Sequence, residues 1–438
     1  MKHTLHIMGL PALKALALGV TLACAASASQ AQQQITIGQF VGNGTVTVDQ
    51  GENTGQATIT IDQNTIIGGN VIVANQARND GAITATIAQA GSDNNVRIDQ
   101  LDNTGINGAR ATQSGDNNTA TLTQVGSTAV SASVDQTGTR NTAAVTQNLS
   151  TDATATVVQN GDGNIANVTQ PGGTADVLQL GADNIANVTG MRGAISQSGR
   201  GNEASMAAST TQSGASIDQS GTRNNARLDI DGSAASSVAV AQNGVENTLR
   251  YTGSPIITTA RMSESGASNV ADVEQRFSGQ SSLLLVLDGN FNSATLTQGA
   301  TFRSGIDVQV LGSSNAATVF QGDLKDSYVT VKQYGLLNKA EVRQTEILTA
   351  GDGLSAAVTQ DGTDNQFLAT QIGSQASINA RQTGDANRLS VAQDGVFNYA
   401  TVSQTGTGNV ADIAQAASNS YVTLAQSGLS NTASINQH

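Results

Sequence analysis

The chain has very few of the side chains on which catalytic and metal sites depend. Its 438 residues include one Cys, three His and no Trp. Cys24, His3 and His6 lie near the start, which leaves His438 as the one other His. Disulfides, thiolate catalysis, zinc clusters and Ser-His-Asp triads all need Cys or His, so this inventory argues against them. We expect no catalytic residue, no metal ligand and no cofactor.

Aromatic side chains and long apolar runs are also scarce. Aromatics make up 3% of the residues, whereas there are 47 Gly. By composition alone the chain resembles a disordered polymer, and a thick globular core is not expected. The formal net charge of −13 argues against nucleic acid as a partner. An ordered fold therefore has to come from periodicity.

The segment 1–31 has the pattern of a secretory signal peptide. Lys2 precedes an apolar run at 15–26, and small residues precede a cleavage site after Ala31. This run is too short for a stable membrane span. Cys24 offers a lipoprotein alternative, but Thr21 and Leu22 fit a lipidation motif badly. We therefore expect a signal peptide at 1–31, degenerate repeats at 32–76 that form a cap or an export segment, and regular repeats at 77–438.

An internal repeat is the strongest signal in the chain. The template Gln-x-Gly-x-x-Asn-x-Ala-x-Φ-x-Gln, where Φ is aliphatic, is clear in QSGDNNTATLTQ (113–124) and QSGLSNTASINQ (426–437). Sixteen repeat starts run from position 89 to position 426. Most of the intervals between them are about 22 to 23 residues, and a fixed period of this length is typical of a repeat architecture. Each period contains two short strand patterns and two turns.

The spacing within the template predicts which side chains point inward. Asn, Ala, Φ and the closing Gln stand at offsets 5, 7, 9 and 11, on one face of a strand with period two. The alternate positions are mostly polar or charged, which suits solvent. We therefore predict an all-β fold, a β-solenoid with two short strands in each coil, where one coil is one period of the repeat.

Inward amides need partners, because an unpaired buried amide costs about 1 to 3 kcal/mol. Identical residues stacked about 4.8 Å apart supply those partners by forming Gln and Asn ladders. The predicted ladder residues are Gln113, Asn118, Gln124, Gln136, Asn141, Gln147, Gln159, Asn164, Gln170, Gln333, Asn338, Gln344, Gln382, Asn387, Gln393, Asn398, Gln404, Asn409, Gln415, Gln426, Asn431 and Gln437. The Gly at offset 2 is expected to supply a positive φ or a close backbone approach. These turn glycines are Gly115, Gly138, Gly161, Gly335, Gly384, Gly395, Gly406 and Gly428.

The repeat resembles the curlin repeat of curli fibres, which are functional amyloids of Gram-negative biofilms. The resemblance covers residues 89–437. It implies export to the periplasm, passage through an outer-membrane pore with accessory factors, and polymerisation at the cell surface as fibre subunit or nucleator. The implied partners are further copies of the chain and other curlin-like subunits, and the ladder residues would then also serve self-assembly.

The middle of the chain departs from the template. Gly190, Ala208, Ile230 and Gly253 replace the closing Gln, and Glu264, Leu287 and Val310 replace the opening Gln. Leu and Val side chains can neither donate nor accept the hydrogen bonds of an amide ladder. We therefore expect interrupted ladders between about residues 190 and 320. These substitutions are explained either by tolerated drift or by a role in moderating aggregation.

Two other function classes remain as alternatives. A monomeric secreted adhesin or ice-binding rod would need a flat outward array of one residue type, which TVTV (45–48) and TITI (58–61) provide only locally. A carbohydrate-cleaving β-helix would need a carboxylate pair. The acidic residues instead scatter through the turns, and the composition offers no aromatic platform for a sugar. We therefore expect a structural protein and not an enzyme.

Overall fold

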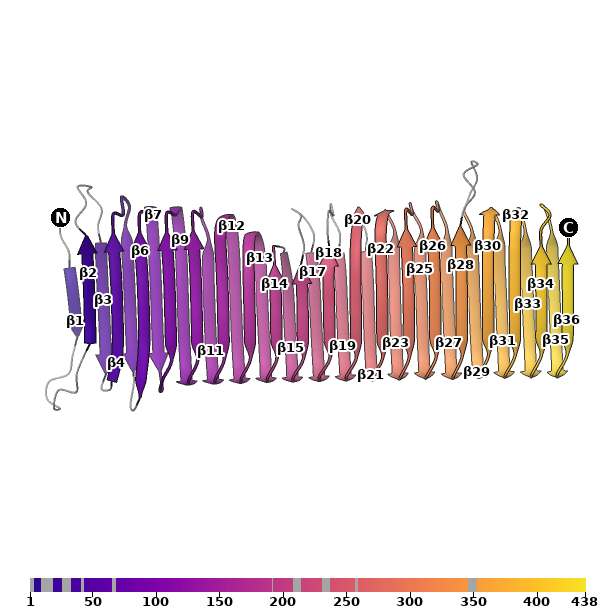
Figure 1. Cartoon of the computed structure of the whole chain (residues 1–438), viewed down its shortest axis with the longest axis horizontal. Coiled ribbons are helices and arrows are strands. Elements are labelled where there is room, and N and C mark those ends of the chain that lie inside the picture. The colour runs from indigo at the N-terminus through magenta and orange to yellow at the C-terminus, as the bar shows by residue number, and fades with distance from the viewer. Residues whose placement is uncertain are drawn as a thin grey trace. The chain divides into compact units, whose positions relative to one another are not determined.

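The computed structural model describes residues 4–8, 19–25, 33–40, 43–64, 68–190, 192–207, 214–230, 237–256, 259–345 and 353–438. Every regular element in these ranges is a β-strand. The chain divides into two units, Met1–Ala207 and Ala208–His438. The predicted β-solenoid is confirmed in each of them (Figure 1).

Unit 1 contains the strands β1 to β16. They are β1 (Thr4–Met8), β2 (Gly19–Ala25), β3 (Gln33–Phe40), β4 (Asn43–Gly51), β5 (Ala57–Asn64), β6 (Gly69–Ala77), β7 (Asp80–Ala90), β8 (Asn95–Leu101), β9 (Thr104–Asp116), β10 (Thr119–Val125), β11 (Ser131–Thr139), β12 (Thr142–Asp162), β13 (Ile165–Ala182), β14 (Ile185–Thr189), β15 (Arg192–Arg200) and β16 (Glu203–Ala207).

Unit 2 contains the strands β17 to β36. They are β17 (Gly214–Thr222), β18 (Asn225–Ile230), β19 (Ser237–Val245), β20 (Thr248–Ile256), β21 (Thr259–Ala267), β22 (Val270–Gly279), β23 (Ser282–Asn290), β24 (Ser293–Gly299), β25 (Gly305–Ser313), β26 (Ala316–Gly322), β27 (Tyr328–Leu336), β28 (Lys339–Thr345), β29 (Ser355–Thr363), β30 (Gln366–Ser374), β31 (Ser377–Asp385), β32 (Arg388–Val396), β33 (Tyr399–Thr407), β34 (Val410–Gln415), β35 (Tyr421–Leu429) and β36 (Thr432–Gln437).

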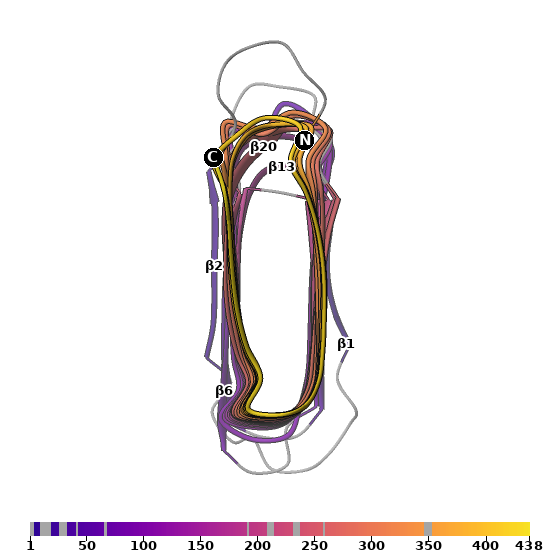
Figure 2. The same cartoon turned by 90° about the vertical axis from the view of Figure 1, so that its right-hand side faces the viewer.

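Each coil has two strands that face each other across a thin core. Strands pair in parallel with the strand two positions along the chain, for example β9 with β11 and β31 with β33. The odd-numbered strands form what we call the first wall of a unit, and the even-numbered strands form its second wall. In unit 1 the long strands β12 and β13 bend and contribute to both walls. Figure 2 shows the two straight walls and the arcs that join them.

The coil length varies without loss of register. Gln113 pairs with Gln136 and Gln382 with Gln404, so the second of these coils is shorter than the first by a single residue. The coil from Ile185 to Glu203 is shorter still, whereas the coil from Gln333 to Gln360 is longer than both. The difference is taken up in the arcs, because a shift of one residue within a strand would turn every inward side chain outward.

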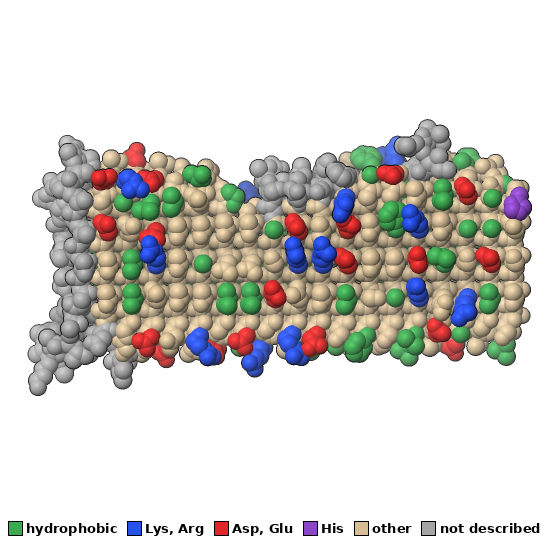
Figure 3. All heavy atoms as spheres, in the orientation of Figure 1, with side chains coloured by type: hydrophobic (Ala, Val, Ile, Leu, Met, Phe, Trp, Pro, Cys, Tyr) green, Lys and Arg blue, Asp and Glu red, His purple; other side chains and the backbone are tan. Residues whose placement is uncertain are grey.

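The core of each unit consists of one thin apolar layer bounded by amides. In unit 1, Ile59, Ile61 and Ile98 are at most 1% exposed, and in unit 2 Leu285 and Val331 are fully buried. Outward side chains alternate with them along each strand. On the face drawn in Figure 3, most outward side chains are uncharged and polar, with single charged or apolar groups between them.

The turn glycines lie at the ends of first-wall and second-wall strands, where the backbones of successive coils approach closely. All eight have a positive φ, between 103° and 133°. A Cβ on Gly115 would lie 2.0 Å from the carbonyl oxygen of Gly138, which stands in the next coil. No side chain fits there, so both reasons apply to the glycines that stack in this way, whereas at Gly395 and Gly428 the positive φ alone applies.

The segment 32–76 joins the solenoid of unit 1. Its strands β3 to β6 continue the register, with Gln50 paired with Gln76 and Gln63 with Gln89. The backbones of β1 and β2, within the predicted signal peptide, pair with β3 and β4. The cleavage site and the role of 32–76 as a cap or export segment stay predictions.

Candidate functional site: the amide columns

The first-wall glutamines of unit 1 form a continuous hydrogen-bonded column. Each Nε2 donates to the Oε1 of the Gln in the next coil, over 2.9 Å from Gln89 to Gln113, 2.7 Å from Gln113 to Gln136 and 2.8 Å from Gln136 to Gln159. Gln113 is 1% exposed and Gln136 is fully buried. A buried amide that would be unfavourable in one isolated coil is therefore satisfied by the stack.

The second hydrogen of the same Nε2 connects the two walls. Gln136 Nε2 donates to the backbone oxygen of Thr119 over 3.0 Å, and Gln159 Nε2 to that of Thr142 over 3.0 Å. Both acceptors belong to second-wall strands. Each of these amides thus holds a coil to the next one and also holds the two walls together.

The second-wall glutamines of unit 1 form a similar column. Gln100 donates to Gln124 over 2.7 Å and Gln124 to Gln147 over 2.8 Å. The bond from Gln147 to Gln170 lengthens to 3.4 Å. Gln170 donates to the carbonyl of Gly173, within its own coil. The column ends there, before the template position that Gly190 occupies.

The Asn column lies at the arc that follows each first-wall strand. In unit 1, Asn141 Oδ1 accepts from the backbone nitrogen of Asn164 over 3.1 Å. Asn141 Nδ2 donates to the carbonyl of Gly161 in the next coil, over 3.0 Å, and to that of Thr137 at the start of its own arc, over 3.3 Å. The Asn side chain therefore closes its own turn and fixes the next turn above it.

Unit 2 repeats the same three columns. Gln382 donates to Gln404 and Gln404 to Gln426, both over 2.9 Å, and Gln393 donates to Gln415 over 2.8 Å. The predicted ladder residues other than Asn398 thus occupy three kinds of position. Gln113, Gln136, Gln159, Gln333, Gln382, Gln404 and Gln426 lie on first walls; Gln124, Gln147, Gln170, Gln344, Gln393, Gln415 and Gln437 lie on second walls; Asn118, Asn141, Asn164, Asn338, Asn387, Asn409 and Asn431 lie in the Asn columns. Asn398 lies in the other arc, where its Oδ1 accepts from the nitrogen of Ser420.

The first-wall Gln column of unit 2 is interrupted as the sequence predicts. Glu264 pairs with Leu287, Leu287 with Val310 and Val310 with Gln333. The two apolar side chains leave Glu264 Oε1 and Gln333 Oε1 buried without a hydrogen-bond partner. The interruption therefore leaves one buried oxygen without a hydrogen-bond partner on each side of the apolar pair.

The other two columns of unit 2 behave differently from each other. The Asn column continues past the apolar pair, with Asn292 Oδ1 accepting from the nitrogen of Asn315 over 3.1 Å, so for this column the prediction was wrong. The second-wall column is interrupted at Ile230 and Gly253, which pair with each other, as expected. It resumes at Gln275, which donates to Gln298 over 2.6 Å, so its interruption ends earlier than expected. Ala208, which also departs from the template, lies outside the described residues.

Glu264 has an unusual environment for a carboxyl group. It is 1% exposed, and its Oε2 accepts a 2.6 Å hydrogen bond from Gln242 Nε2. Burial disfavours its charged form and raises its pKa to about 8, although the hydrogen bond from Gln242 opposes the shift. At neutral pH the Glu264 side chain is therefore mainly protonated.

The arcs contain two features that the sequence did not reveal. The residue directly before the column Asn adopts the left-handed region, and in most arcs it is not Gly, as at Arg140 (φ 56°) and Leu337 (φ 57°). Charged arc residues, which the sequence assigned simply to solvent, also pair between coils. Arg140 lies 2.5 Å from Asp162 and Arg223 lies 2.5 Å from Glu246. The hydrogen bond from Arg140 lowers the pKa of Asp162.

A family model supports the interpretation of the repeat. The model of the curlin associated repeat matches residues 384–416, which run from Gly384 through three Asn-marked arcs and both walls. The chain carries the curlin-associated repeat. No curated protein matches it. Because the matched coils share their register and columns with the coils around them, the curlin-repeat geometry extends beyond the matched segment in unit 2.

The described part of this curlin-repeat chain offers neither a metal cluster nor a membrane helix. In those residues no three His, Cys, Asp or Glu side chains gather as a metal ion would require. No helix long and apolar enough for a membrane span occurs among them. The outward Thr58 and Thr60 stack on Thr84 and Thr86, but Gly108 and Arg110 follow in the next coil. The paired Thr-x-Thr array is therefore two coils deep, because Gln34 and Thr36 occupy its two positions in the preceding coil.

Proposed function

We propose that the protein is a secreted structural protein that polymerises into curli-like amyloid fibres on the cell surface, as a fibre subunit or as a nucleator. The fold and the curlin-associated repeat support a structural, non-enzymatic role. Export through the periplasm and an outer-membrane pore belongs to the same proposal, as does the biofilm and adhesion role of such fibres.

One observation carries the proposal: each coil is held to the next by contacts that do not depend on chain connectivity. The coil of Gln404 and the coil of Gln426 are joined by paired strand backbones, by the hydrogen bond between these two glutamines, and by the Asn column. None of these contacts requires that the two coils belong to the same chain. A coil of a second copy can make the same contacts at an open strand edge. Among the described residues, β36 pairs with β34 alone, and its inward residues Ala433 and Ile435 are only half-buried.

The test uses the mature chain, 32–438, purified in denaturant and transferred to buffer. We expect a lag phase, thioflavin binding and fibre diffraction at about 4.8 Å. A chain that stays monomeric at high concentration would contradict the proposal. Seeding a shorter curlin with this protein distinguishes the two roles, since a nucleator shortens the lag of the other subunit at substoichiometric amounts.

A further inference from the structure

The few tyrosines of the chain are not scattered over its surface. There are five, and Tyr251 is buried in the core. Of the other four, Tyr328, Tyr399 and Tyr421 occupy one register row at the start of first-wall strands of unit 2. They are 54%, 38% and 67% exposed, and the last two rings stack with centroids 5.0 Å apart. The sequence analysis, which considered aromatic side chains by composition, did not anticipate this row.

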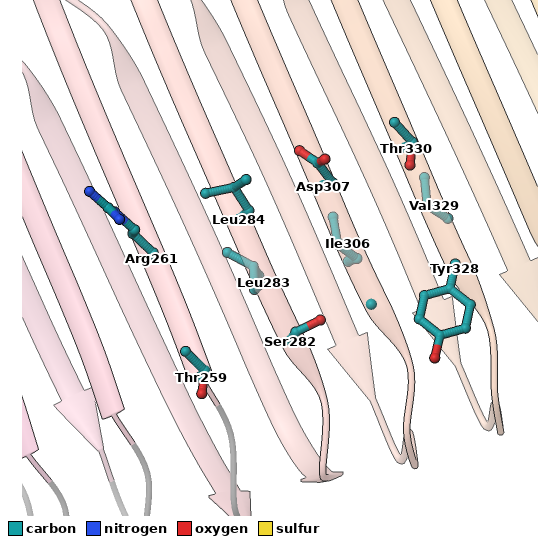
Figure 4. A pocket seen from close by; sticks show the side chains of 11 residues that line it. Thr259, Arg261, Ser282, Leu283, Leu284, Ile306, Asp307, Tyr328, Val329 and Thr330 are labelled. Carbon is teal, nitrogen blue, oxygen red and sulfur yellow. The ribbon is translucent and has the colours of Figure 1, made fainter.

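A shallow depression lies beside the first of these tyrosines. It has a volume of about 380 Å³ and lies over β21, β23, β25 and β27 (Figure 4). Gly305 lies in its floor, because the register places Gly305 between Ser282 and Tyr328. A Cβ at Gly305 would lie 3.0 Å from both Ser282 Oγ and Tyr328 Cδ1. The missing side chain therefore allows the Tyr328 ring to lie close against strand β25, where it lines the depression.

The rim of this depression is polar but has no net charge. In Figure 4, Arg261, Leu284, Asp307 and Thr330 follow one another across the four strands, in the row next to Ser282 and Tyr328. The guanidinium of Arg261 and the carboxylate of Asp307 thus stand on either side of the apolar Leu284. A fitting ligand has an apolar face for Leu284 and Tyr328, and it has both hydrogen-bond donors and acceptors around that face.

A second depression continues the same row. It has a volume of about 410 Å³ and is lined by Ser355, Ser377 and Tyr399, among others. Three coils separate Tyr328 from Tyr399, a distance of about 14 Å at the usual strand spacing. One extended ligand can therefore cover both depressions, provided that it repeats the same chemistry along its length.

We propose that this row of unit 2 binds a neutral polysaccharide. A pyranose ring presents C–H groups on its face and hydroxyl groups at its edge, which matches an aromatic wall with a charged and hydroxyl-bearing rim. The opposite charges of Arg261 and Asp307 cancel, so the site suits an uncharged chain better than an acidic one. The small side chains of Ser355 and Ser377 keep the track between Tyr328 and Tyr399 open.

The test is calorimetric titration of the full mature chain, freshly desalted, with neutral hexasaccharides of β-linked and α-linked glucose. We expect binding of at least one of them, and Tyr328→Ala to weaken it roughly tenfold through loss of the aromatic wall. Tyr328→Phe keeps the wall and should retain most of the affinity. Gly305→Val fills the depression and should weaken binding as much as Tyr328→Ala.

Tyr334→Ala is the matched control, because Tyr334 is an outward tyrosine on the same strand, β27, outside both depressions. It should bind like the wild type, and all variants should keep the wild-type circular dichroism and fibre lag time. The proposal is overturned if neither hexasaccharide binds, or if Tyr334→Ala loses as much affinity as Tyr328→Ala. It is also overturned if Tyr328→Ala mainly abolishes self-association without sugar, which would make the row an interface between copies. The titration results do not depend on whether fibres form.

Discussion

The hydroxyl of Tyr251 donates a 2.8 Å hydrogen bond to Gln275 Oε1, in the position where the column would otherwise have another Gln. The template position itself holds Gly253, which pairs with Gln275 in register. A Cβ on Gly253 would lie 2.8 Å from the Tyr251 hydroxyl oxygen. The tyrosine, two residues earlier on the same inward face, therefore fills the space of the missing Gln and supplies its donor. Its burial also raises the pKa of the Tyr251 hydroxyl, which keeps the donor protonated.

Removing that hydroxyl should destabilise unit 2. Tyr251→Phe leaves Gln275 Oε1 buried without a donor, and we expect a loss of about 1 to 3 kcal/mol in the free energy of unfolding. Urea denaturation of the monomeric mature chain, followed by circular dichroism, measures it. Tyr334→Phe changes an outward tyrosine in the same way and should be neutral. Equal stability of Tyr251→Phe and the wild type would show that the hydrogen bond contributes nothing.

Repairing the interrupted first-wall column should accelerate assembly. Leu287→Gln and Val310→Gln together place an amide next to both Glu264 Oε1 and Gln333 Oε1, the two oxygens without a partner beside the apolar pair. We expect a shorter lag in thioflavin assays for the double variant than for either single one, since each single change still leaves an apolar neighbour. Unchanged lag times would exclude a role for this pair in moderating aggregation.

The sequence was sufficient to predict the walls and the columns, because successive side chains of a strand point alternately to its two faces. Once Gln136 and Asn141 are assigned inward, the parity of every other residue in that coil follows. The role of Tyr251 was not accessible in the same way. A Tyr two residues before a missing Gln is recognisable as its replacement only when the next coil's register is known. The ion pair between Arg140 and Asp162 could not be predicted for the same reason, because it depends on which arcs become neighbours.

Glu264 should make the stability of unit 2 depend on pH. Its folded pKa of about 8 is above its ordinary value of 4.5, so the folded state holds the proton more tightly. The contribution of Glu264 to the free energy of unfolding is therefore fully present below pH 4.5 and is lost as the pH rises towards 8. The total loss is on the order of 4 to 5 kcal/mol. Denaturation curves between pH 4 and 9 measure this loss. Glu264→Gln removes the ionisable group and should flatten the profile over that range, whereas a profile equal to that of the wild type would assign the pH dependence to other groups.

The close approach of glycines between coils should make their substitution far more costly than substitution elsewhere. Gly138 has a φ of 111°, and a Cβ there would lie 2.0 Å from the carbonyl oxygen of Gly161. Gly138→Ala must therefore displace one coil from the next, and we expect it to cost unit 1 about 2 kcal/mol or more and to slow fibre growth.

Gly299 provides the control for this prediction, because a Cβ there meets no atom within 4 Å and its φ is not in the left-handed region. Gly299→Ala should leave both stability and growth close to the wild type. The comparison separates two explanations of the repeated glycines. If the two variants behave alike, these glycines serve only general chain flexibility; if Gly138→Ala alone is impaired, contact between successive backbones requires them. The structure predicts the second result, since the gap between the two coils at Gly138 is too narrow for any side chain.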